Sequence, residues 1–444
     1  MQPFNRLPIA TASSDSDQRK LKIDVFLNHF RTGLVRGFIT FFFSKKGVHF
    51  SYASMFSVDR RAAAAAAALI FAATASLGAA TDENAETAGT AKADAAFDKT
   101  LGQLIDQPGG PPGAIAVVQR DHQPVKVFRK GVADQETGAR ILVPDRFRVG
   151  SVGKAFNGAV ALQLVAQGKL SLSDAIGQRL PTLPPAWHNV TLGQLLNHTS
   201  GLPNFTKDPG WQRAAQKGEY LSPMDLIGLV SAQPLAFPPG SSYAYSNTDN
   251  IVVGLFAEMA TGLSYDLLLY QLVFDRLHLR HTVMSLGFSM QGPFIHGYDN
   301  NATGERDDIS EALNMSEVWA AGAQISSLFD LNRFIRSYAG GKLFGGATRA
   351  AQTNFVPGGE SEPKGPGENS AGMALFKYDT RCGTVYGHTG NFPGYTTIAV
   401  SSPDGRRSFV MLVSTQLDKA AGVPATFQFW RRTAEDGVCA ALAR

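Results

Sequence analysis

Short strand-like runs occur near both ends of the 444-residue chain, and the long middle part between them is mostly helical in pattern. Two runs precede residue 134 and three follow residue 382, and turn-forming residues such as Pro403-Asp404-Gly405 join neighbouring runs. Strands that are joined by short turns pair antiparallel. We therefore expect an α+β fold, in which an antiparallel five-stranded sheet from both chain ends is flanked by helices and carries a mostly helical inserted subdomain. The five runs are Ala114–Arg120, Val125–Ala133, Gly383–Gly390, Tyr395–Ser402 and Arg407–Ser414.

Helix signals support this division of the chain. Ser222, followed by Pro223 and Asp225, is typical of a helix start, and Gly262 is expected to end a helix over Asn247–Thr261. Ser327 is expected to start another helix, and a last one is expected over about Pro424–Leu442. The sheet region is thus predicted at about 97–150 and 325–444, and the helical region at about 165–320.

Residues 55–80 have the pattern of a secretory signal peptide. Met55 precedes Arg60 and Arg61, an apolar stretch runs from Ala62 to Leu77, and small residues follow. A short alanine-rich membrane anchor is the alternative. Cleavage would leave a secreted or periplasmic protein with no stable membrane span.

The segments around this signal determine the other boundaries. Signal peptides stand at the N-terminus, so we interpret residues 1–54 as a non-native or disordered extension, with a cytoplasmic tail as the alternative. Residues 81–96 are small and polar and are predicted to be a linker. The folded domain is then predicted at 97–444.

Charge and cysteine content exclude several function classes. Residues 1–80 carry a net charge of +6 and the rest −2, so the body gives no electrostatic reason to expect nucleic-acid binding. Cys382 and Cys439 are the only cysteines; in an exported protein they favour one disulfide, with two separate buried thiols as the alternative. No cysteine or histidine pattern has metal-ligand spacing, so we expect no metal and no cofactor.

Ser151 and Lys154 form the sharpest chemical pattern. Lys154 is the only charged residue between Ser151 and Gly168, in a segment apolar enough to be a buried helix. Residues three apart on a helix are neighbours, and a desolvated lysine is a competent base for a serine nucleophile. A snorkelling surface lysine is the alternative. A second Ser-x-x-Lys, Ser361–Lys364, contains Pro363 within the Gly/Pro-rich segment Gly358–Gly372, so we expect it in a surface loop.

Two further motifs carry suitable side chains. Tyr245 could pass a proton to a leaving group if cations lower its pKa, and Asn247 could hold a substrate backbone and orient Lys154. His388-Thr389-Gly390 ends a strand, where Gly390 lets a substrate backbone approach. The N–H groups of Ser151 and Asn391 could then form an oxyanion hole. For His388 by itself, a packed or surface histidine is the alternative.

The order of the three motifs resembles the penicillin-recognising serine hydrolases. Tyr245 follows Ser151 by 94 residues, and His388 follows Tyr245 by 143. The flanking segments 145–151, 195–202 and 386–390 also match, and the resemblance spans about 98–444. It is strongest to the Streptomyces-type D-alanyl-D-alanine carboxypeptidases, which have His in the third motif, within the class C β-lactamase-related group.

This resemblance implies a β-lactamase/transpeptidase-like fold and a role for each motif residue. Ser151 would be the nucleophile, Lys154 the base, Tyr245 the proton carrier to the leaving amine, Asn247 a contact of the acyl amide, and His388 an electrostatic substitute for the usual lysine. Thr389, Gly390 and Asn391 would bind substrate, and Trp319 would form a pocket wall, with a core or surface position as the alternative. The resemblance also implies a disulfide between Cys382 and Cys439.

Two positions depart from the carboxypeptidase pattern. Phe376, next to Lys377, stands where an arginine would bind the substrate carboxylate, and Asn391 stands where a threonine would help. We therefore expect a secreted serine D-alanyl-D-alanine carboxypeptidase acting on cell-wall peptides, as a monomer. Its acyl donors would be peptides or esters, with β-lactams among the candidates. The alternatives are an esterase or class C-like β-lactamase on the same scaffold and, in another class, a non-catalytic β-lactam or cell-wall sensor.

Overall fold

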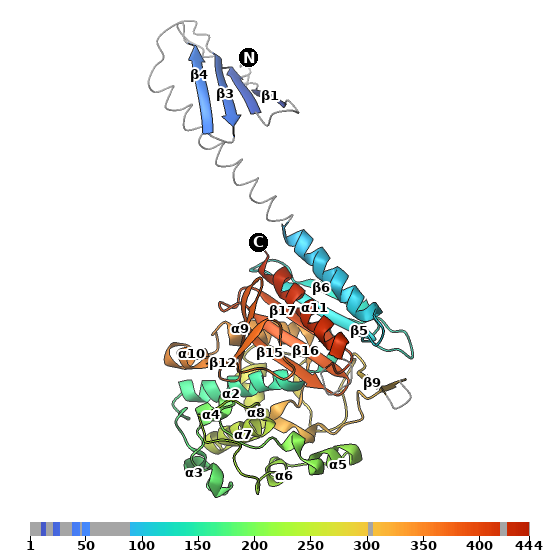
Figure 1. The fold of residues 1–444 in the computed structure, drawn as a ribbon, viewed down its shortest axis with the longest axis vertical. Helices are drawn as coiled ribbons and strands as arrows, with labels where there is room; N and C mark the ends of the chain where they lie inside the picture. Colours follow the sequence, from blue (N-terminus) through green and yellow to red (C-terminus); the bar gives the residue numbers. More distant parts are fainter. Residues whose placement is uncertain are drawn as a thin grey trace, which may run out of the picture. The chain divides into compact units, whose positions relative to one another are not determined.

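The computed structural model describes residues 10–14, 21–26, 38–44, 47–53, 89–300, 305–417 and 424–443, in two compact units, Met1–Ala85 and Glu86–Arg444. The first unit contains an antiparallel sheet in the order β1-β2-β3-β4 (Figure 1). Its strands are Ala10–Ser14, Leu21–Phe26, Phe38–Ser44 and Gly47–Ala53. The interpretation of residues 1–54 as a non-native or disordered extension stays a prediction. The predicted signal peptide, 55–80, lies outside the described residues.

An eight-stranded antiparallel sheet forms the centre of the second unit, in the order β12-β13-β14-β15-β16-β17-β5-β6. The five predicted strands are all present, so the fold class is confirmed, but five is too few. The three extra strands are short and lie just before, within and just after the Gly/Pro-rich stretch 358–372, and they show little alternating pattern. The strands are Val356–Pro357, Glu368–Ala371, Phe376–Thr380, Gly383–Phe392, Tyr395–Ser401, Ser408–Val413, Gly113–Gln119 and Lys126–Gly131.

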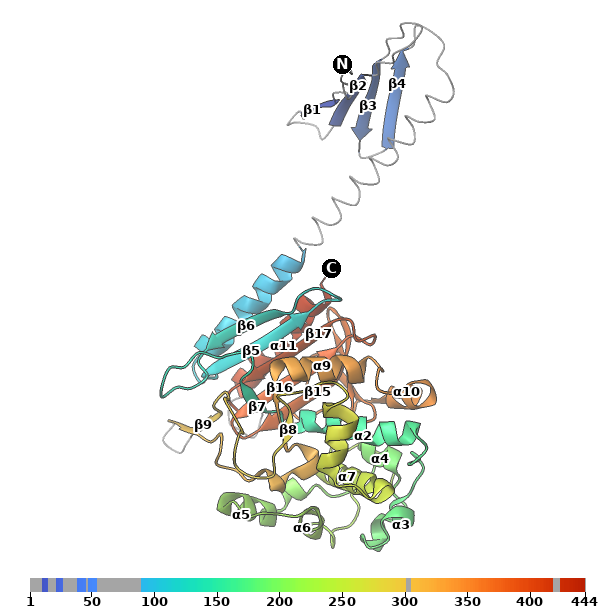
Figure 2. The same cartoon turned by 180° about the vertical axis from the view of Figure 1, so that it is seen from behind.

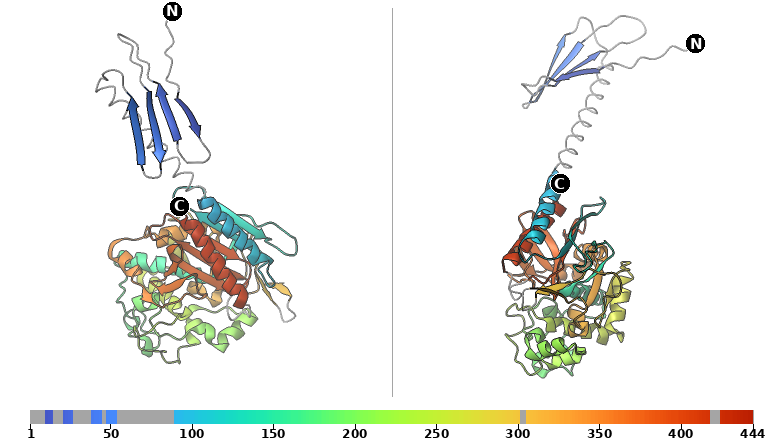
Figure 3. Two further views of the ribbon diagram at one scale, coloured as in Figure 1. Left: turned by 45° about the horizontal axis from the view of Figure 1, so that its top comes forward. Right: turned by 90° about the vertical axis from the view of Figure 1, so that its right-hand side faces the viewer.

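Helices cover both faces of this sheet. Alternate residues of β5 pack in opposite directions, because Ala116 belongs to one apolar cluster and Val117 to the other. The face to which Ala116 points carries α11 (Pro424–Leu442) and the helix over 89–106, which lie side by side in Figures 1 and 3. The face to which Val117 points carries α2 (Gly153–Ala166) and α9 (Leu328–Ala339), seen from behind in Figure 2. The unit is thus a helix–sheet–helix sandwich.

The helix over 89–106 corrects the predicted linker, 81–96. Residues 89–96 are helical, and residues 81–88 lie outside the described part of the chain. Asp94 is 5% exposed and forms an ion pair with Arg120 at the end of β5. A composition of small polar residues did not reveal this contact, because the partner lies 26 residues away.

The helical region lies mainly between β7 (Arg146–Arg148) and β11 (Gln324–Ser327). In a small sheet, β11 pairs with β7 on one side and with β8 (Val283–Met284) on the other. The predicted helix starts at Ser222 and Ser327 and the predicted helix end at Gly262 are confirmed. In the described ranges, no single helix is long and apolar enough to cross a membrane. Helix α7 (Asn247–Thr261) and the following helical residues 265–274 meet these criteria only when they are taken together, and this pair is bent by 85°. The helices are α3 (Ile176–Arg179), α4 (Leu192–Leu196), α5 (Pro209–Lys217), α6 (Pro223–Gly228), α7 (Asn247–Thr261) and α8 (Tyr265–Leu269).

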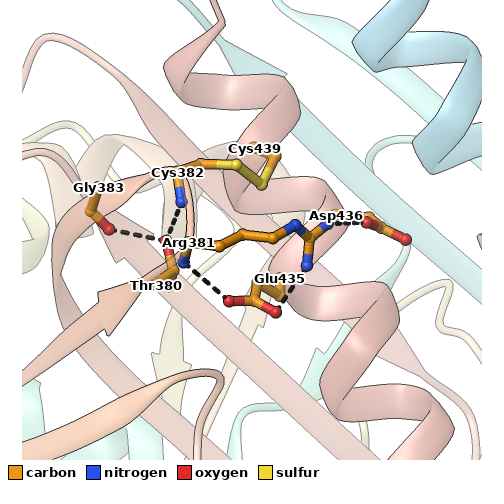
Figure 4. The surroundings of a disulfide bond; sticks show 7 residues. All are labelled: Thr380, Arg381, Cys382, Gly383, Glu435, Asp436 and Cys439. Atoms are coloured by element: carbon orange, nitrogen blue, oxygen red, sulfur yellow. Dashed lines mark hydrogen bonds and ion pairs between the residues drawn. A yellow bond between two sulfur atoms is a disulfide. The ribbon is translucent and has the colours of Figure 1, made fainter.

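Cys382 and Cys439 are joined in a disulfide with a Cα–Cα distance of 5.2 Å, as expected (Figure 4). The bond ties the turn before β15 to α11. Arg381 supports the same junction through ion pairs with Glu435 and Asp436. The C-terminal helix is thereby fixed to the strand that carries the third motif.

Candidate active site

Ser151 lies at the point where the chain enters α2, in the short helix η1 (Gly150–Val152). Gly150 has φ +55°, and a Cβ there would lie 2.8 Å from the carbonyl oxygen of Asn391. Only glycine fits both the backbone conformation and the space. A Cβ on Gly390 would likewise lie 2.1 Å from the carbonyl oxygen of Val149. These two glycines let the serine turn pack directly against β15.

Lys154 is buried next to Ser151. Its side chain is hydrogen-bonded to Ser151 Oγ, with Nζ at 3.0 Å, and to the carbonyl oxygen of Ala321, at 2.9 Å. Lys154 is 1% exposed, and burial lowers the pKa of its amine to about 7, against the opposing charges of Glu362 and Asp249. About half of the amine is therefore neutral at pH 7, which a general base requires. The snorkelling alternative for Lys154 is excluded.

Tyr245 faces this pair from the other side of the site. The Nζ atom of Lys154 lies 5.2 Å from the centroid of its ring. Burial raises the pKa of the phenol well above its usual value, and the nearby Ser151 hydroxyl only partly opposes this. The condition considered from the sequence, that cations lower this pKa, is not met, because desolvation is the larger effect. Tyr245 is a neutral phenol at rest, able to donate a proton.

Asn247, at the start of α7, is held by two residues that the sequence analysis did not identify. Its side-chain nitrogen donates to Asn204 Oδ1 and Thr206 Oγ1, each at 3.2 Å, and its backbone N–H donates to Asn204 Oδ1 at 3.1 Å. Asn204 also caps η3 (Phe205–Lys207), and an asparagine after Pro203 was a usable cap signal. Lys154 is oriented by Ala321 rather than by Asn247, contrary to expectation.

A buried histidine lies behind Tyr245. His198 has its ring centroid 4.5 Å from that of Tyr245, and its Nδ1 is 2.7 Å from Asp249 Oδ2. Burial raises the pKa of Asp249 and lowers that of His198 to about 3. Burial thus disfavours the charged form of both side chains, and the pair packs behind the tyrosine ring.

His388 does not replace a lysine electrostatically. It is fully buried on β15, with its ring edge against Phe376 at a centroid distance of 5.0 Å. Burial, followed by the charge of Lys154, lowers its pKa to about 3. The imidazole is neutral at any pH near 7, so the expected electrostatic role is wrong.

Thr389 is turned away from substrate. Its side chain is fully buried, and its hydroxyl donates to the carbonyl oxygen of Pro363 at 2.5 Å. Phe376 is buried as well, and the ammonium of Lys377 pairs with Asp379 at 2.7 Å. None of these three residues offers a group to a substrate carboxylate.

Trp319 is a core residue, not a pocket wall. It is 6% exposed, and its ring lies 5.1 Å from that of Tyr265 and against Gly254 of α7. Its neighbours Val318 and Ala321 reach the pocket instead. The aromatic side chains that line the pocket are Trp211, Tyr243, Tyr245, Phe392 and Phe427.

Ser151, Tyr245, Asn247 and Asn391 line one cavity of about 1200 Å³. The cavity is also lined by the segment 358–364 and by residues of α11. Of the described residues, no three His, Cys, Asp or Glu side chains are grouped closely enough to hold a metal ion. The arrangement provides a serine, a partly neutral lysine and a neutral tyrosine at one end of an open pocket, which is suited to acyl transfer.

Comparison with known proteins identifies the family of the second unit. Residues 97–428 match the family model described as Beta-lactamase. The chain is 29% identical over 202 residues to a Beta-lactamase of Pseudomonas fluorescens, covering 46% of this chain and 54% of that protein. It is 25% identical over 289 residues to Penicillin-binding protein 4* of Bacillus subtilis, covering 61% of each. The match thus spans between half and two thirds of these relatives.

One solved structure is matched by this chain over nearly its whole length. The D-stereospecific amidohydrolase from Streptomyces sp. is 29% identical, with a TM-score of 0.64 over 75% of this chain and 98% of that one. The fold of the second unit is therefore β-lactamase/transpeptidase-like, as the resemblance implied.

Proposed function

This chain belongs to the Beta-lactamase family of penicillin-recognising serine hydrolases, and we propose that it hydrolyses amide or ester bonds through an acyl intermediate on Ser151. The observation that carries the proposal is the 3.0 Å contact between the Ser151 hydroxyl and a buried lysine whose pKa is about 7. A lysine with the ordinary pKa would be charged and could not accept the proton.

Acylation would use the geometry as follows. Neutral Lys154 takes the hydroxyl proton while Ser151 Oγ bonds to the acyl carbon. The backbone N–H groups of Ser151 and Asn391 stabilise the negative charge on the carbonyl oxygen. Tyr245 gives its proton to the leaving amine or alcohol and regains one from Lys154. Water then releases the acyl group, with its proton returning through the same two side chains.

The acyl donors that we propose are amides or esters without a carboxylate next to the scissile bond. Thr389 donates to Pro363, His388 is neutral, and Phe376 stands where an arginine was expected. These observations favour an amidase or esterase over a D-alanyl-D-alanine carboxypeptidase. The amidohydrolase likeness supports the same choice.

A D-alanyl-D-alanine carboxypeptidase is the second candidate, because Penicillin-binding protein 4* is among the relatives. We further propose export of the protein, secreted or periplasmic, from the signal pattern at 55–80. The donor class is tested by measuring turnover of a p-nitroanilide, a p-nitrophenyl ester and a peptide ending in D-alanyl-D-alanine. Hydrolysis of either chromogenic substrate without release of D-alanine supports the proposal, and efficient release of D-alanine contradicts it.

A further inference from the structure

The second Ser-x-x-Lys pattern, Ser361–Lys364, is not a second catalytic pair. Ser361 is 1% exposed, so the expectation that it lies in a surface loop is wrong. Its hydroxyl donates to the carbonyl oxygen of Pro363 at 3.0 Å, and Lys364 forms an ion pair with Glu360. Both groups are engaged elsewhere, so this pattern provides no second nucleophile.

The backbone of residues 319–322 lies directly against the catalytic serine turn. The carbonyl oxygen of Ala321 accepts a hydrogen bond from the Lys154 amine at 2.9 Å. A Cβ on Gly322 would lie 3.1 Å from the carbonyl oxygen of Gly150, so the two backbones are in close contact. The position of this short segment therefore decides where the lysine amine points.

Trp319, the first residue of η6 (Trp319–Ala321), has an unusual backbone conformation. Its φ is +33°, in the left-handed region that a bulky L-residue rarely adopts. In this conformation its carbonyl oxygen accepts from the N–H groups of Gly322 and Ala323, at 3.3 and 3.0 Å, which closes the turn that presents the Ala321 carbonyl. Such a conformation costs free energy and persists only where the surroundings hold it.

The indole ring provides that hold. Trp319 is 6% exposed, and the centroid of its ring lies 5.1 Å from that of Tyr265. A Cβ on Gly254 of α7 would lie 2.7 Å from Cζ3 of the indole, so only glycine leaves room for the ring. A glycine at position 319 would adopt the positive φ at no cost, but it would leave the turn without this anchor.

We propose that Trp319 is a positioning residue for Lys154. Its ring, fixed on α7, keeps η6 in the conformation that directs the Ala321 carbonyl at the lysine amine. Trp319 itself touches no substrate, because it lies in the core and does not line the pocket. This inference rests on the proposed function, since the direction of the amine matters only if Lys154 is the base.

Loss of this hold has a defined effect on the lysine. Without the Ala321 carbonyl, the amine can turn away from Ser151 Oγ, which slows acylation. The ammonium also loses an acceptor, and because a charged donor forms the stronger hydrogen bond, the pKa of Lys154 should fall below its present value of about 7. Entry of water into a loosened site would raise this pKa, since hydration favours the ammonium. The sign of the pKa shift thus separates lost positioning from general loosening.

The test compares the wild type with Trp319→Phe, using initial rates of p-nitrophenyl acetate hydrolysis from pH 5 to 9. Phenylalanine lacks the part of the indole that reaches Gly254, but it keeps an aromatic ring in the core. On the plateau above about pH 8, kcat/KM should fall about 10- to 100-fold. The midpoint of the pH profile should lie at a lower pH than in the wild type. A partly unfolded sample would lower the rate at every pH and leave the midpoint unchanged.

Gly254→Ala perturbs the same contact from the other side, because the new methyl group would displace the indole. It should lower kcat/KM and move the midpoint in the same direction, and it decides the question by itself if Trp319→Phe does not fold. The matched control is Val253→Ala, which removes a buried side chain from the neighbouring position of α7 and should keep the wild-type midpoint.

An unchanged or raised midpoint in either variant, or an equally lowered one in the control, would overturn the inference while leaving the acyl-serine intact. A wild type without Ser151-dependent hydrolysis of p-nitrophenyl acetate would instead overturn the proposed function, and the inference with it.

Discussion

The amine of Lys154 lies 3.0 Å from the hydroxyl oxygen of Ser151, three residues earlier in the chain, with 1% of the lysine exposed. Proximity by itself would leave a charged lysine beside a neutral serine. Burial changes this, because desolvation disfavours the ammonium and brings its pKa to about 7. The same contact therefore explains both the position and the activation of the nucleophile.

The pH dependence of acylation follows from the Lys154 pKa. The neutral amine is the active form, and its fraction rises with pH through about 7. The kcat/KM for p-nitrophenyl acetate should fall about tenfold per pH unit below pH 6 and level off above about pH 8. Initial rates from pH 5 to 9 measure this profile. A flat or descending profile would show that Lys154 is not the base.

Lys154→Met should abolish activity and stabilise the fold. Between about pH 7 and 10.5 the unfolded chain binds a proton that the folded chain lacks, so wild-type stability rises with pH in this range. Below pH 7 the full cost of burying the charge remains. At pH 6.5 the variant should gain roughly 1–3 kcal/mol in free energy of unfolding, after allowing for its two lost hydrogen bonds.

Urea unfolding of both proteins at pH 6.5 and pH 10 measures this difference. The gain should shrink at the higher pH, where the lysine is neutral in the folded state and the unfolded chain has begun to lose the same proton. An inactive variant that is destabilised equally at both pH values would contradict the account.

Tyr245→Phe should affect amides more than activated esters. The neutral phenol is assigned to protonate the leaving group, which an amine requires and a nitrophenolate does not. We expect a loss of roughly 10²–10⁴-fold in kcat for a p-nitroanilide and a much smaller loss for p-nitrophenyl acetate. Steady-state kinetics with both substrates give the comparison. Equal losses on both would argue for a structural role of the hydroxyl.

The disulfide should contribute to stability without contributing to chemistry. It joins residues 57 apart, and closing a loop of that length stabilises by about 3–4 kcal/mol. The double variant Cys382→Ser/Cys439→Ser should lose about that much in denaturant unfolding. The matched control is Arg381→Gln, which removes only exposed ion pairs at the same junction and should cost less than about 1 kcal/mol. A similar loss in both variants would point to the ion pairs instead.

Patterns within one element were sufficient to predict part of this site. Ser151 and Lys154 are three residues apart where η1 continues directly into α2, and a single charge in an apolar stretch indicates burial without knowledge of the fold. The helix ends at Ser222, Gly262 and Ser327 were predictable for the same reason, since capping depends on neighbours in the chain.

The third motif could not be interpreted in this way. The hydroxyl of Thr389 donates to the carbonyl oxygen of Pro363, which lies 26 positions earlier in a stretch with no regular pattern. Similarly, His388 loses its charge to burial by Phe376, which belongs to the neighbouring strand. These outcomes depend on contacts between elements, which no local pattern contains.

The most direct test of the account is the intact mass of the full chain, and of Ser151→Ala, quenched in acid shortly after mixing with p-nitrophenyl acetate. We expect the wild type to gain the mass of one acetyl group and fragmentation to place it on Ser151, while the variant remains unmodified. An acetyl group on another residue, or equal modification of both proteins, would contradict the assignment of Ser151 as the nucleophile.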